Sequence, residues 1–513
     1  MANCNDVRTR MIQRIARSIL RSYYKPVERF IQYPLGTQND TLNYLLKHGR
    51  DTFYGREHNF REVKGDADYR TRVPLIAYED LRPYLDKVII EKEKNVLWDT
   101  PVKWFAMSSG TTEDKSKYIP VTRESLFNGS YRAGYHMLGL YAIHHPDTSF
   151  ILGKTLVMGG SQQVNRIGDG IFTGDISAIL MRNLPKMVKR RRTPESIALI
   201  SDWEEKLERL TEYAVQADIR AMVGVPSWTL VLLKKIVQDT GKTIPELWPR
   251  IEVFFHGGVS FLPFQEPYKK IIPVDRMSYW ETYNASEGFF GVQFSPESSD
   301  LLLLLDNEVY YEFIPMEQVG NDSPETIPLE GVQVGKQYAV VISTSGGLWR
   351  YKLGDTVEFT STDPYLFKVT GRTKQFINAF GEELIVDNAE RAMEEACRLT
   401  GAKVVEYTAA PIFFDEHHNG AHEWLIEFEV SPPSLELFAL QLDESLKRLN
   451  SDYEAKRSYN LSLEPPVIRA MARGTFYNWM KQRERVGGQN KVPKLSNDRK
   501  HVESLLAFVR KES

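Results

Sequence analysis

One turn in the chain carries the residue types that bind phosphate groups. Its five central residues are Ser108, Ser109, Gly110, Thr111 and Thr112. Lys115 and Lys117 follow, and residues 102–107 before the turn are predicted to form a strand. Backbone N–H groups of such a turn can converge on anionic oxygens, while glycine permits close approach and an ammonium adds charge. The spacing is not that of the Walker motif, and taken alone the turn is equally typical of an ordinary loop.

Two carboxylates farther along the chain could complete a nucleotide site. Glu287 lies in a turn after a predicted aromatic strand, and the residues before it are Tyr283, Asn284, Ala285 and Ser286. A carboxylate in such a turn could hold Mg²⁺, which prefers oxygen ligands and keeps waters and phosphates around it. Asp355 ends a β-rich run and could accept hydrogen bonds from both ribose hydroxyls. Each carboxylate alone is also explained by capping of a turn.

The three motifs together, in this order, resemble those of the adenylate-forming superfamily of acyl-activating enzymes. More narrowly, the chain resembles the acyl-acid amido synthetases of the auxin-responsive, plant-hormone-conjugating type, which join hormone carboxylic acids to amino acids. Supporting segments are residues 310–315, 334–355 and 371–378, the last followed by Gly381 and Glu382. The resemblance spans roughly residues 100 to 390 and includes a C-terminal lysine motif. Unrelated chains rarely carry four ordered motifs.

The resemblance implies a nucleotide site with ATP and Mg²⁺ as cofactors. Asp355 and Arg372 would hold the ribose, and Glu287 would hold the metal. Gly257 and Gly258 fall where the superfamily places a glycine pair against the adenine, since two glycines let a flat base lie on the backbone. The remaining nucleotide-binding residues implied in this way are Ser108, Ser109, Gly110, Thr111, Thr112, Tyr283, Ala285 and Ser286.

Catalysis is assigned by resemblance to two lysines, Lys117 and Lys491. Lys491 lies in residues 487–494, where a glycine pair precedes lysine and proline, and would offset charge at the reacting carboxylate and α-phosphate. Its place in the chain implies a second domain that moves over the site. Glu113 and Asp114 depart from the family, whose members often carry small residues there. Carboxylates beside a triphosphate are unfavourable unless they point away or hold Mg²⁺. This departure from the family leaves open whether Lys115 or Lys117 is the phosphate-loop lysine.

The resemblance implies a ligase that works in two steps. A carboxylic acid is adenylated by ATP with release of pyrophosphate, and an amino acid or amine then takes the acyl group with release of AMP. Two alternatives stay open: an acyl-CoA ligase, and a nucleotide-binding protein without catalytic activity. The match at residues 310–315 and 334–355 favours the amide-forming branch. No residue identifies the acid or the acceptor.

The composition agrees with a soluble, cytoplasmic enzyme. The chain has 513 residues with a net charge of −3, which gives no reason to expect nucleic acid or an acidic membrane as partner. Only Cys4 and Cys397 are present, so a disulfide framework is not expected. The apolar run 301–305 is too short for a membrane span and predicts a buried strand.

The arginine-rich amphipathic helix from Arg8 to Arg21 resembles membrane-surface or transit helices, but packing on the core is the favoured interpretation. The oligomeric state is not indicated.

The order of predicted elements favours an α/β fold with a large multi-sheet N-terminal adenylation domain and a smaller, mobile α+β C-terminal domain. Residues 1–373 would bind ATP and the acyl acid, and residues 374–513 would carry the adenylation lysine. Helices are predicted at 122–145, 195–217 and 229–240, and strands dominate 300–370. After Arg372 the pattern changes to a helix at 387–400, a strand at 423–430 and a helix at 433–450.

Overall fold

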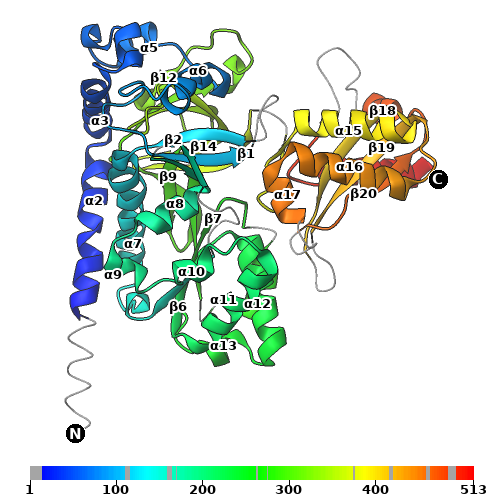
Figure 1. Ribbon diagram of the computed structural model, residues 1–513, viewed down its shortest axis with the longest axis horizontal. Helices are drawn as coiled ribbons and strands as arrows, with labels where there is room; N and C mark the ends of the chain where they lie inside the picture. Colours follow the sequence, from blue (N-terminus) through cyan, green and yellow to red (C-terminus); the bar gives the residue numbers. More distant parts are fainter. Residues whose placement is uncertain are drawn as a thin grey trace.

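The computed structural model describes residues 14–109, 116–158, 165–168, 170–261, 264–273, 275, 277–373, 376–414, 420–457, 463–482 and 493–512. It has a large N-terminal domain of mixed sheets and helices and a separate, smaller C-terminal domain, as predicted (Figure 1). The predicted boundary between residues 373 and 374 stays a prediction, and residues 374 and 375 lie outside the described residues.

The main sheet of the N-terminal domain has, within the described residues, the order β12-β11-β13-β14-β15-β10-β9-β8-β7-β6-β3. Four neighbouring strands run parallel: β3 (Lys154–Val157), β6 (Ile219–Gly224), β7 (Val253–Gly257) and β8 (Ser278–Ala285). The other strands pair antiparallel: β9 (Gly288–Ser295), β10 (Ser298–Leu303), β11 (Val309–Pro315), β12 (Ile327–Pro328), β13 (Gln337–Thr344), β14 (Tyr351–Thr362) and β15 (Tyr365–Arg372). The sheet therefore changes from parallel to antiparallel at β8, next to the predicted nucleotide residues.

Helices cover both faces of the parallel strands because alternate residues of each strand point to opposite sides. On one face, Tyr141 of α7 (Arg132–His144) packs against Phe255 and Trp280 with ring centroids 5.4 Å apart in both pairs. On the other, Phe254 stacks on Tyr268 of α14 (Gln265–Ile271) at 5.3 Å. The helices of this second face include α11 (Trp203–Gln216), α12 (Pro226–Thr240) and α13 (Ile244–Leu247).

The predicted helix at 195–217 is wrong as a single element. The structure has α10 (Glu195–Ala198) and α11, separated by a turn in which Asp202 accepts a hydrogen bond from the Glu205 amide at 2.8 Å. A side-chain cap of this kind starts a new helix. The helix predicted at 229–240 begins earlier, at Pro226, because proline suits the first helical position.

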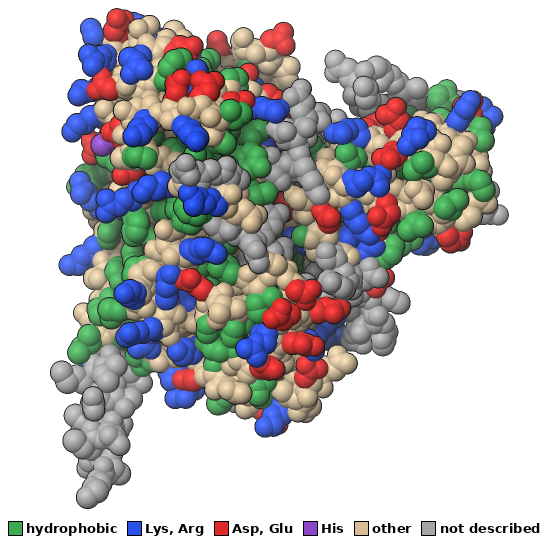
Figure 2. Space-filling model, viewed as in Figure 1, with side chains coloured by type: hydrophobic (Ala, Val, Ile, Leu, Met, Phe, Trp, Pro, Cys, Tyr) green, Lys and Arg blue, Asp and Glu red, His purple; other side chains and the backbone are tan. Residues whose placement is uncertain are grey.

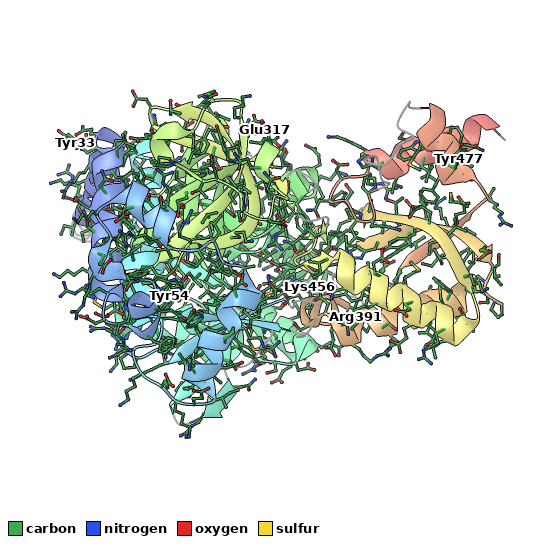
Figure 3. The ribbon with its side chains drawn as sticks, turned by 90° about the horizontal axis from the view of Figure 1, so that it is seen from above. Tyr33, Tyr54, Glu317, Arg391, Lys456 and Tyr477 are labelled. Atoms are coloured by element: carbon green, nitrogen blue, oxygen red, sulfur yellow. The ribbon has the colours of Figure 1, made fainter. Side chains whose placement is uncertain are left out.

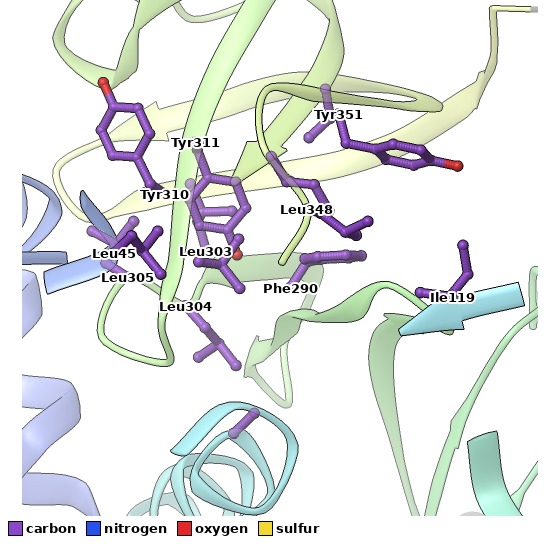
Figure 4. Close-up of a cluster of buried hydrophobic side chains, with 14 of the residues drawn as sticks. Leu45, Ile119, Phe290, Leu303, Leu304, Leu305, Tyr310, Tyr311, Leu348 and Tyr351 are labelled. Carbon is purple, nitrogen blue, oxygen red and sulfur yellow. The ribbon is translucent and has the colours of Figure 1, made fainter. Parts of the chain in front are cut away.

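A second core lies under the antiparallel strands, where the leucine run 301–305 is buried as predicted (Figure 4). The N-terminal helices α2 (Tyr24–Gln32) and α3 (Pro34–Gly49) join this cluster through residues such as Phe30 and Leu45. Smaller helices on the same domain are α4 (Phe53–Glu57), α5 (Asp66–Arg72), α6 (Tyr78–Ile89), α8 (Ile176–Asn183) and α9 (Lys186–Lys189). A π-helical turn, Ser125–Tyr131, leads into α7.

The arginine-rich N-terminal segment packs only in part. In its described portion Leu20 is buried, whereas Ile15 and Ile19 are half exposed, at 50% and 47%. Lys and Arg side chains gather over α2 and α9 on the face seen in Figure 2. Within the described residues, no helix combines the length and apolarity needed to cross a membrane.

A small sheet stands beside the main one and carries the predicted phosphate turn. Its strands have the order β2 (Ser116–Val121), β1 (Trp104–Ser109), β5 (Ile171–Gly174) and β4 (Asn165–Gly168). The predicted strand before the turn is therefore confirmed, and the turn itself joins two antiparallel strands.

The C-terminal domain opens with a short hairpin of β16 (Phe376–Ile377) and β17 (Leu384–Ile385). Its sheet consists of β18 (Lys403–Ile412), β19 (Ala421–Val430) and β20 (Val467–Met471). Helices α15 (Val386–Thr400) and α16 (Leu435–Leu449) pack on one face, and α18 (Thr475–Gln482) and α19 (Lys500–Glu512) on the other. Helix α17 (Ser451–Arg457) faces the N-terminal domain (Figure 1).

Candidate active site

The residues predicted to bind ribose form one hydrogen-bonded group. Strands β14 and β15 pair so that Asp355 stands opposite Arg372, and Tyr283 approaches from β8. The Asp355 carboxylate accepts hydrogen bonds from the Tyr283 hydroxyl at 2.5 Å and from Arg372 Nε at 2.8 Å. Burial, together with the charge of Asp355, holds the pKa of Tyr283 well above its ordinary value, so the phenol stays a donor. The carboxylate is thus oriented by two donors, Arg372 on the neighbouring strand β15 and Tyr283 on the more distant strand β8.

Arg372 is itself held by two residues of the C-terminal domain. Its guanidinium carbon lies 4.9 Å from the ring centroid of Phe376, and one of its nitrogens donates to Glu383 at 3.4 Å. Opposite charges hold the pKa of Arg372 above its ordinary value despite burial. Glu383 was not predicted as a site residue. The only sequence signal was its position next to Gly381 and Glu382, which belong to the quoted motif.

Glu287 lies in the tight turn between β8 and β9, where Ala285 pairs with Gly288. Burial raises the pKa of its carboxyl to about 7, and the negative charges of Glu383 and Asp355 act in the same direction. Lys117 opposes this shift. A poorly solvated carboxylate on which two other carboxylates act gains from a cation, so Glu287 fits a magnesium ion whose other ligands are water and phosphate oxygens. Among the described residues, no cluster of three metal-ligating side chains forms.

Only part of the predicted phosphate turn can be described. Ser108 stands opposite Lys117 and Ser109 opposite Ser116, so β1 and β2 stay paired up to the two ends of the turn. Lys117 lies 5.8 Å from the ring centroid of Tyr78. Gly110, Thr111, Thr112 and Lys115 lie outside the described residues. The choice between Lys115 and Lys117 therefore stays open, although Lys117 acts electrostatically on Glu287.

The glycine pair at the end of β7 has a structural reason that the sequence did not reveal. A Cβ on Gly257 would lie 2.3 Å from the carbonyl oxygen of Thr282 on the neighbouring strand. Gly258 has a φ of +84°, which favours glycine. Its carbonyl accepts a hydrogen bond from Asn378 Nδ2 at 3.3 Å. Gly257 thus permits the close approach of β8, Gly258 provides a left-handed backbone conformation, and the contact of the pair with adenine stays a prediction.

Lys491 lies outside the described residues, but the segment after it is placed. The Pro493 carbonyl accepts a hydrogen bond from the Thr408 hydroxyl at 2.6 Å, and Lys494 Nζ binds Glu406 at 2.5 Å. Lys494 is therefore engaged within the C-terminal domain, on β18.

In fold, the molecule is similar to the solved structures of a CoA ligase and of an acyl acid amido synthetase. It aligns with 2-hydroxyisobutyryl-CoA ligase in complex with 2-HIB-AMP and CoA at a TM-score of 0.58 and 13% identity, over 95% of this chain and 94% of that chain. It also aligns with the GH3.15 acyl acid amido synthetase in complex with 2,4-DB at a TM-score of 0.58 and 19% identity, over 97% and 96%.

Sequence comparison gives the particular family. Models of the GH3 family match residues 23–277 as its N-terminal domain, 302–372 as its central domain and 387–500 as its C-terminal domain. The chain therefore belongs to the GH3 family. Indole-3-acetic acid-amido synthetase GH3.3 from Arabidopsis thaliana is 24% identical to it over 86% of both chains.

Proposed function

We propose that this protein is an ATP-dependent acyl-acid amido synthetase. The observation that carries the proposal is the group of Asp355, Tyr283 and Arg372, with Glu287 and Lys117 beside it. These residues meet where the parallel part of the sheet ends, which is where open α/β sheets bind ligands. Family membership adds that named relatives are amido synthetases.

In the first step, an oxygen of the substrate carboxylate bonds to the α-phosphorus of ATP, and the bond to pyrophosphate breaks. Asp355 would hold the ribose, and its two donors would keep that carboxylate from turning. Glu287 would bind Mg²⁺, which supplies charge neutralisation to the phosphates. The turn from Ser108 to Thr112 and Lys117 would bind phosphate oxygens, and Lys491 would offset charge on the reacting groups.

In the second step, the amine nitrogen of the acceptor attacks the carbonyl carbon of the acyl-adenylate. The C–O bond to AMP breaks, and the nitrogen loses a proton. We assign the chain a mobile C-terminal domain of residues 374–513, because Lys491 must reach the site for the first step and leave it for the second.

An acyl-CoA ligase is the second candidate, because it shares the first step and the fold of 2-hydroxyisobutyryl-CoA ligase. The three GH3 models favour the amide-forming reaction. We place the enzyme in the cytoplasm, in keeping with a chain that has two cysteines and in which Cys397 is a free thiol.

The first test is ATP–pyrophosphate exchange with Mg²⁺ against a panel of carboxylic acids, including indole-3-acetic acid. We expect exchange that depends on one acid class and is lost in Lys491→Ala and Glu287→Ala, but not in the exposed control Lys500→Ala. Amino acids and CoA are then compared as acceptors. ATP binding without exchange for any acid would refute the catalytic proposal, and turnover with CoA alone would favour the ligase alternative.

A further inference from the structure

Two buried cations show how this protein compensates a buried charge. Arg350, in the core under the antiparallel strands, donates to Glu312 at 2.9 Å. Lys456 of α17, which Figure 3 labels at the junction of the two domains, has its ammonium 3.9 Å from the ring centroid of Trp228. The carboxylates that act on Lys456 are those of Asp452, Glu382, Asp175 and Glu383. Anions of the chain itself therefore balance both charges, as the cost of an unpaired buried charge requires.

Arg192 has no such anion among the described residues. It is half-buried and follows α9 in the chain. The titratable side chains that act on its charge are two phenols, Tyr131 and Tyr135. Burial raises the pKa of Tyr131, so this phenol is neutral and cannot balance the charge. Burial also lowers the pKa of the Arg192 guanidinium, but arginine remains protonated in proteins, so a positive charge without an anion stays there.

The main sheet sets the position of Arg192. This residue forms a parallel bridge with Thr155 of β3, the strand that ends the main sheet within the described residues. The Thr155 amide donates to the Arg191 carbonyl at 2.7 Å, and the Thr155 carbonyl accepts a hydrogen bond from the Thr193 amide at 3.1 Å. The side chain of Arg192 therefore projects from a backbone that the sheet holds in place.

An aromatic stripe lies beside the guanidinium, where α8 and α9 adjoin α7 (Figure 1). The stripe consists of Phe127, Tyr131 and Tyr135, which recur at intervals of four residues from the π-helical turn into α7. The ring centroids of Phe127 and Tyr131 are 5.3 Å apart, and the Tyr131 hydroxyl donates to the Leu180 carbonyl of α8 at 2.7 Å. Phe127 and Tyr135 are 44% and 37% exposed, so solvent reaches the stripe on both sides of Tyr131.

A carboxylate on an apolar molecule is the ligand that fits this group of residues. A guanidinium presents parallel N–H donors that match the two oxygens of a carboxylate. One guanidinium balances one negative charge, whereas a phosphate dianion carries about two and needs more cations. The exposed faces of Phe127 and Tyr135 offer apolar contact to the rest of the ligand, and the Tyr135 hydroxyl can donate to the same anion.

We propose that Arg192 and the aromatic stripe form a binding site for the carboxylate group of an organic acid. Two molecules could supply this group: an acyl substrate that has a second, distal carboxylate, or a separate acid that binds apart from the substrate. Binding itself is independent of the proposed function, and only the first of these two sources rests on it.

The binding test compares Arg192→Met, which keeps the aliphatic stem and removes the charge, with Arg191→Met at its exposed neighbour. Benzoate, indole-3-acetate and inorganic phosphate are titrated separately into the full-length protein by isothermal titration calorimetry. We expect saturable binding of at least one carboxylate probe, weakened at least about tenfold by Arg192→Met and changed less than about twofold by Arg191→Met. Phosphate should bind more weakly. Arg192→Lys, which keeps the charge without the planar fork, should give an intermediate affinity.

Pyrophosphate exchange separates the two sources of the carboxylate. Dicarboxylic acids of graded length are compared as substrates with monocarboxylic acids of the same length. If the acyl substrate supplies the group, one dicarboxylic acid should be preferred, and Arg192→Met should raise its KM about tenfold without changing the KM of the matched monocarboxylic acid. If a separate acid supplies it, the carboxylate probe should bind equally well in the presence of a saturating acyl acid. Absence of exchange with every acid would refute the proposed function and leave the binding site standing.

Thermal denaturation shows whether Arg192 is instead a structural residue. Without ligand, Arg192→Met should melt at the same temperature as the unsubstituted protein or at a higher one, because the substitution removes an unbalanced charge. A saturating carboxylate probe should raise the Tm of the unsubstituted protein but not that of Arg192→Met. A lower Tm for ligand-free Arg192→Met would show that the guanidinium pairs with a group of the chain itself, and would overturn the inference. Absence of carboxylate binding, binding that Arg192→Met leaves unchanged, or equal weakening by Arg191→Met would also overturn it.

Discussion

Asp355 offers a direct test of the nucleotide site, because both partners of the proposed hydrogen bond can be removed. The carboxylate is removed by substitution, and the ribose hydroxyl by using 2′-deoxy-ATP. The carboxylate is 10% exposed and is already oriented by Tyr283 and Arg372. A hydrogen bond from a ribose hydroxyl to such a carboxylate contributes about 1.5–3 kcal/mol. The unsubstituted protein should therefore bind 2′-deoxy-ATP about 10- to 150-fold more weakly than ATP.

The substitution Asp355→Ala should remove this discrimination, so that both nucleotides bind with similar, weak affinity. The affinities of both proteins for both nucleotides must be compared, because the substitution also affects Arg372. Among its described ion pairs, Arg372 would keep only the longer contact to Glu383. Any general loss of stability affects both nucleotides equally and cancels in the cycle. Isothermal titration calorimetry gives the affinities, and thermal denaturation reports the stability change separately.

Glu212 provides a matched control, since it pairs with Arg209 at 2.9 Å on the surface of α11, away from the nucleotide residues. Glu212→Ala should leave the discrimination between ATP and 2′-deoxy-ATP unchanged. If Asp355→Ala keeps the same ratio of affinities as the unsubstituted protein, Asp355 does not contact the ribose. Its role would then be to neutralise Arg372.

Three further outcomes follow from the site and its supports. Since the pKa of Glu287 is raised to about 7, its carboxylate forms as pH rises through that value, and Mg²⁺ affinity measured with ATP should increase about tenfold from pH 6 to pH 8. Gly257→Ala should lower the free energy of unfolding by about 1–3 kcal/mol in thermal denaturation, because its Cβ would meet the Thr282 carbonyl at 2.3 Å. Glu312→Gln should lower it by about 3–5 kcal/mol in urea, because Arg350 donates to Glu312 at 2.9 Å within the core.

Each of these outcomes has its own control. Glu287→Gln carries no titrating carboxyl, so it should retain only the pH dependence that comes from ATP, and an identical profile in both proteins would contradict the assignment. Gly134→Ala has open space around its Cβ and should not destabilise the protein. Glu212→Gln removes an exposed carboxylate, and a loss as large as that of Glu312→Gln would show that burial is not the cause.

The fold class and most elements near the site could be predicted from the sequence. Apolar residues along the chain indicate the strands, and five consecutive leucines at 301–305 are enough to predict that this segment is buried. The break between α10 and α11 was missed because a single aspartate cap, Asp202, interrupts an otherwise continuous helical pattern.

The geometry of the site depends on register and could not be predicted in the same way. Asp355 and Arg372 are adjacent only because β14 and β15 pair with bulges that fix which residues stand opposite. The reason for Gly257 lies on another strand, at Thr282. Lys456 gives no sequence signal, since its partner Trp228 lies in the other domain.

The apolar contact between the two domains also has a thermodynamic consequence. Phe380 is fully buried, and Phe414 contacts Phe264 of the N-terminal domain with ring centroids 5.8 Å apart. Any rotation that separates these rings exposes apolar surface to water, and exposed apolar surface raises the heat capacity. Because such burial weakens on cooling, the apolar contact between the two domains should become less stable as the temperature falls.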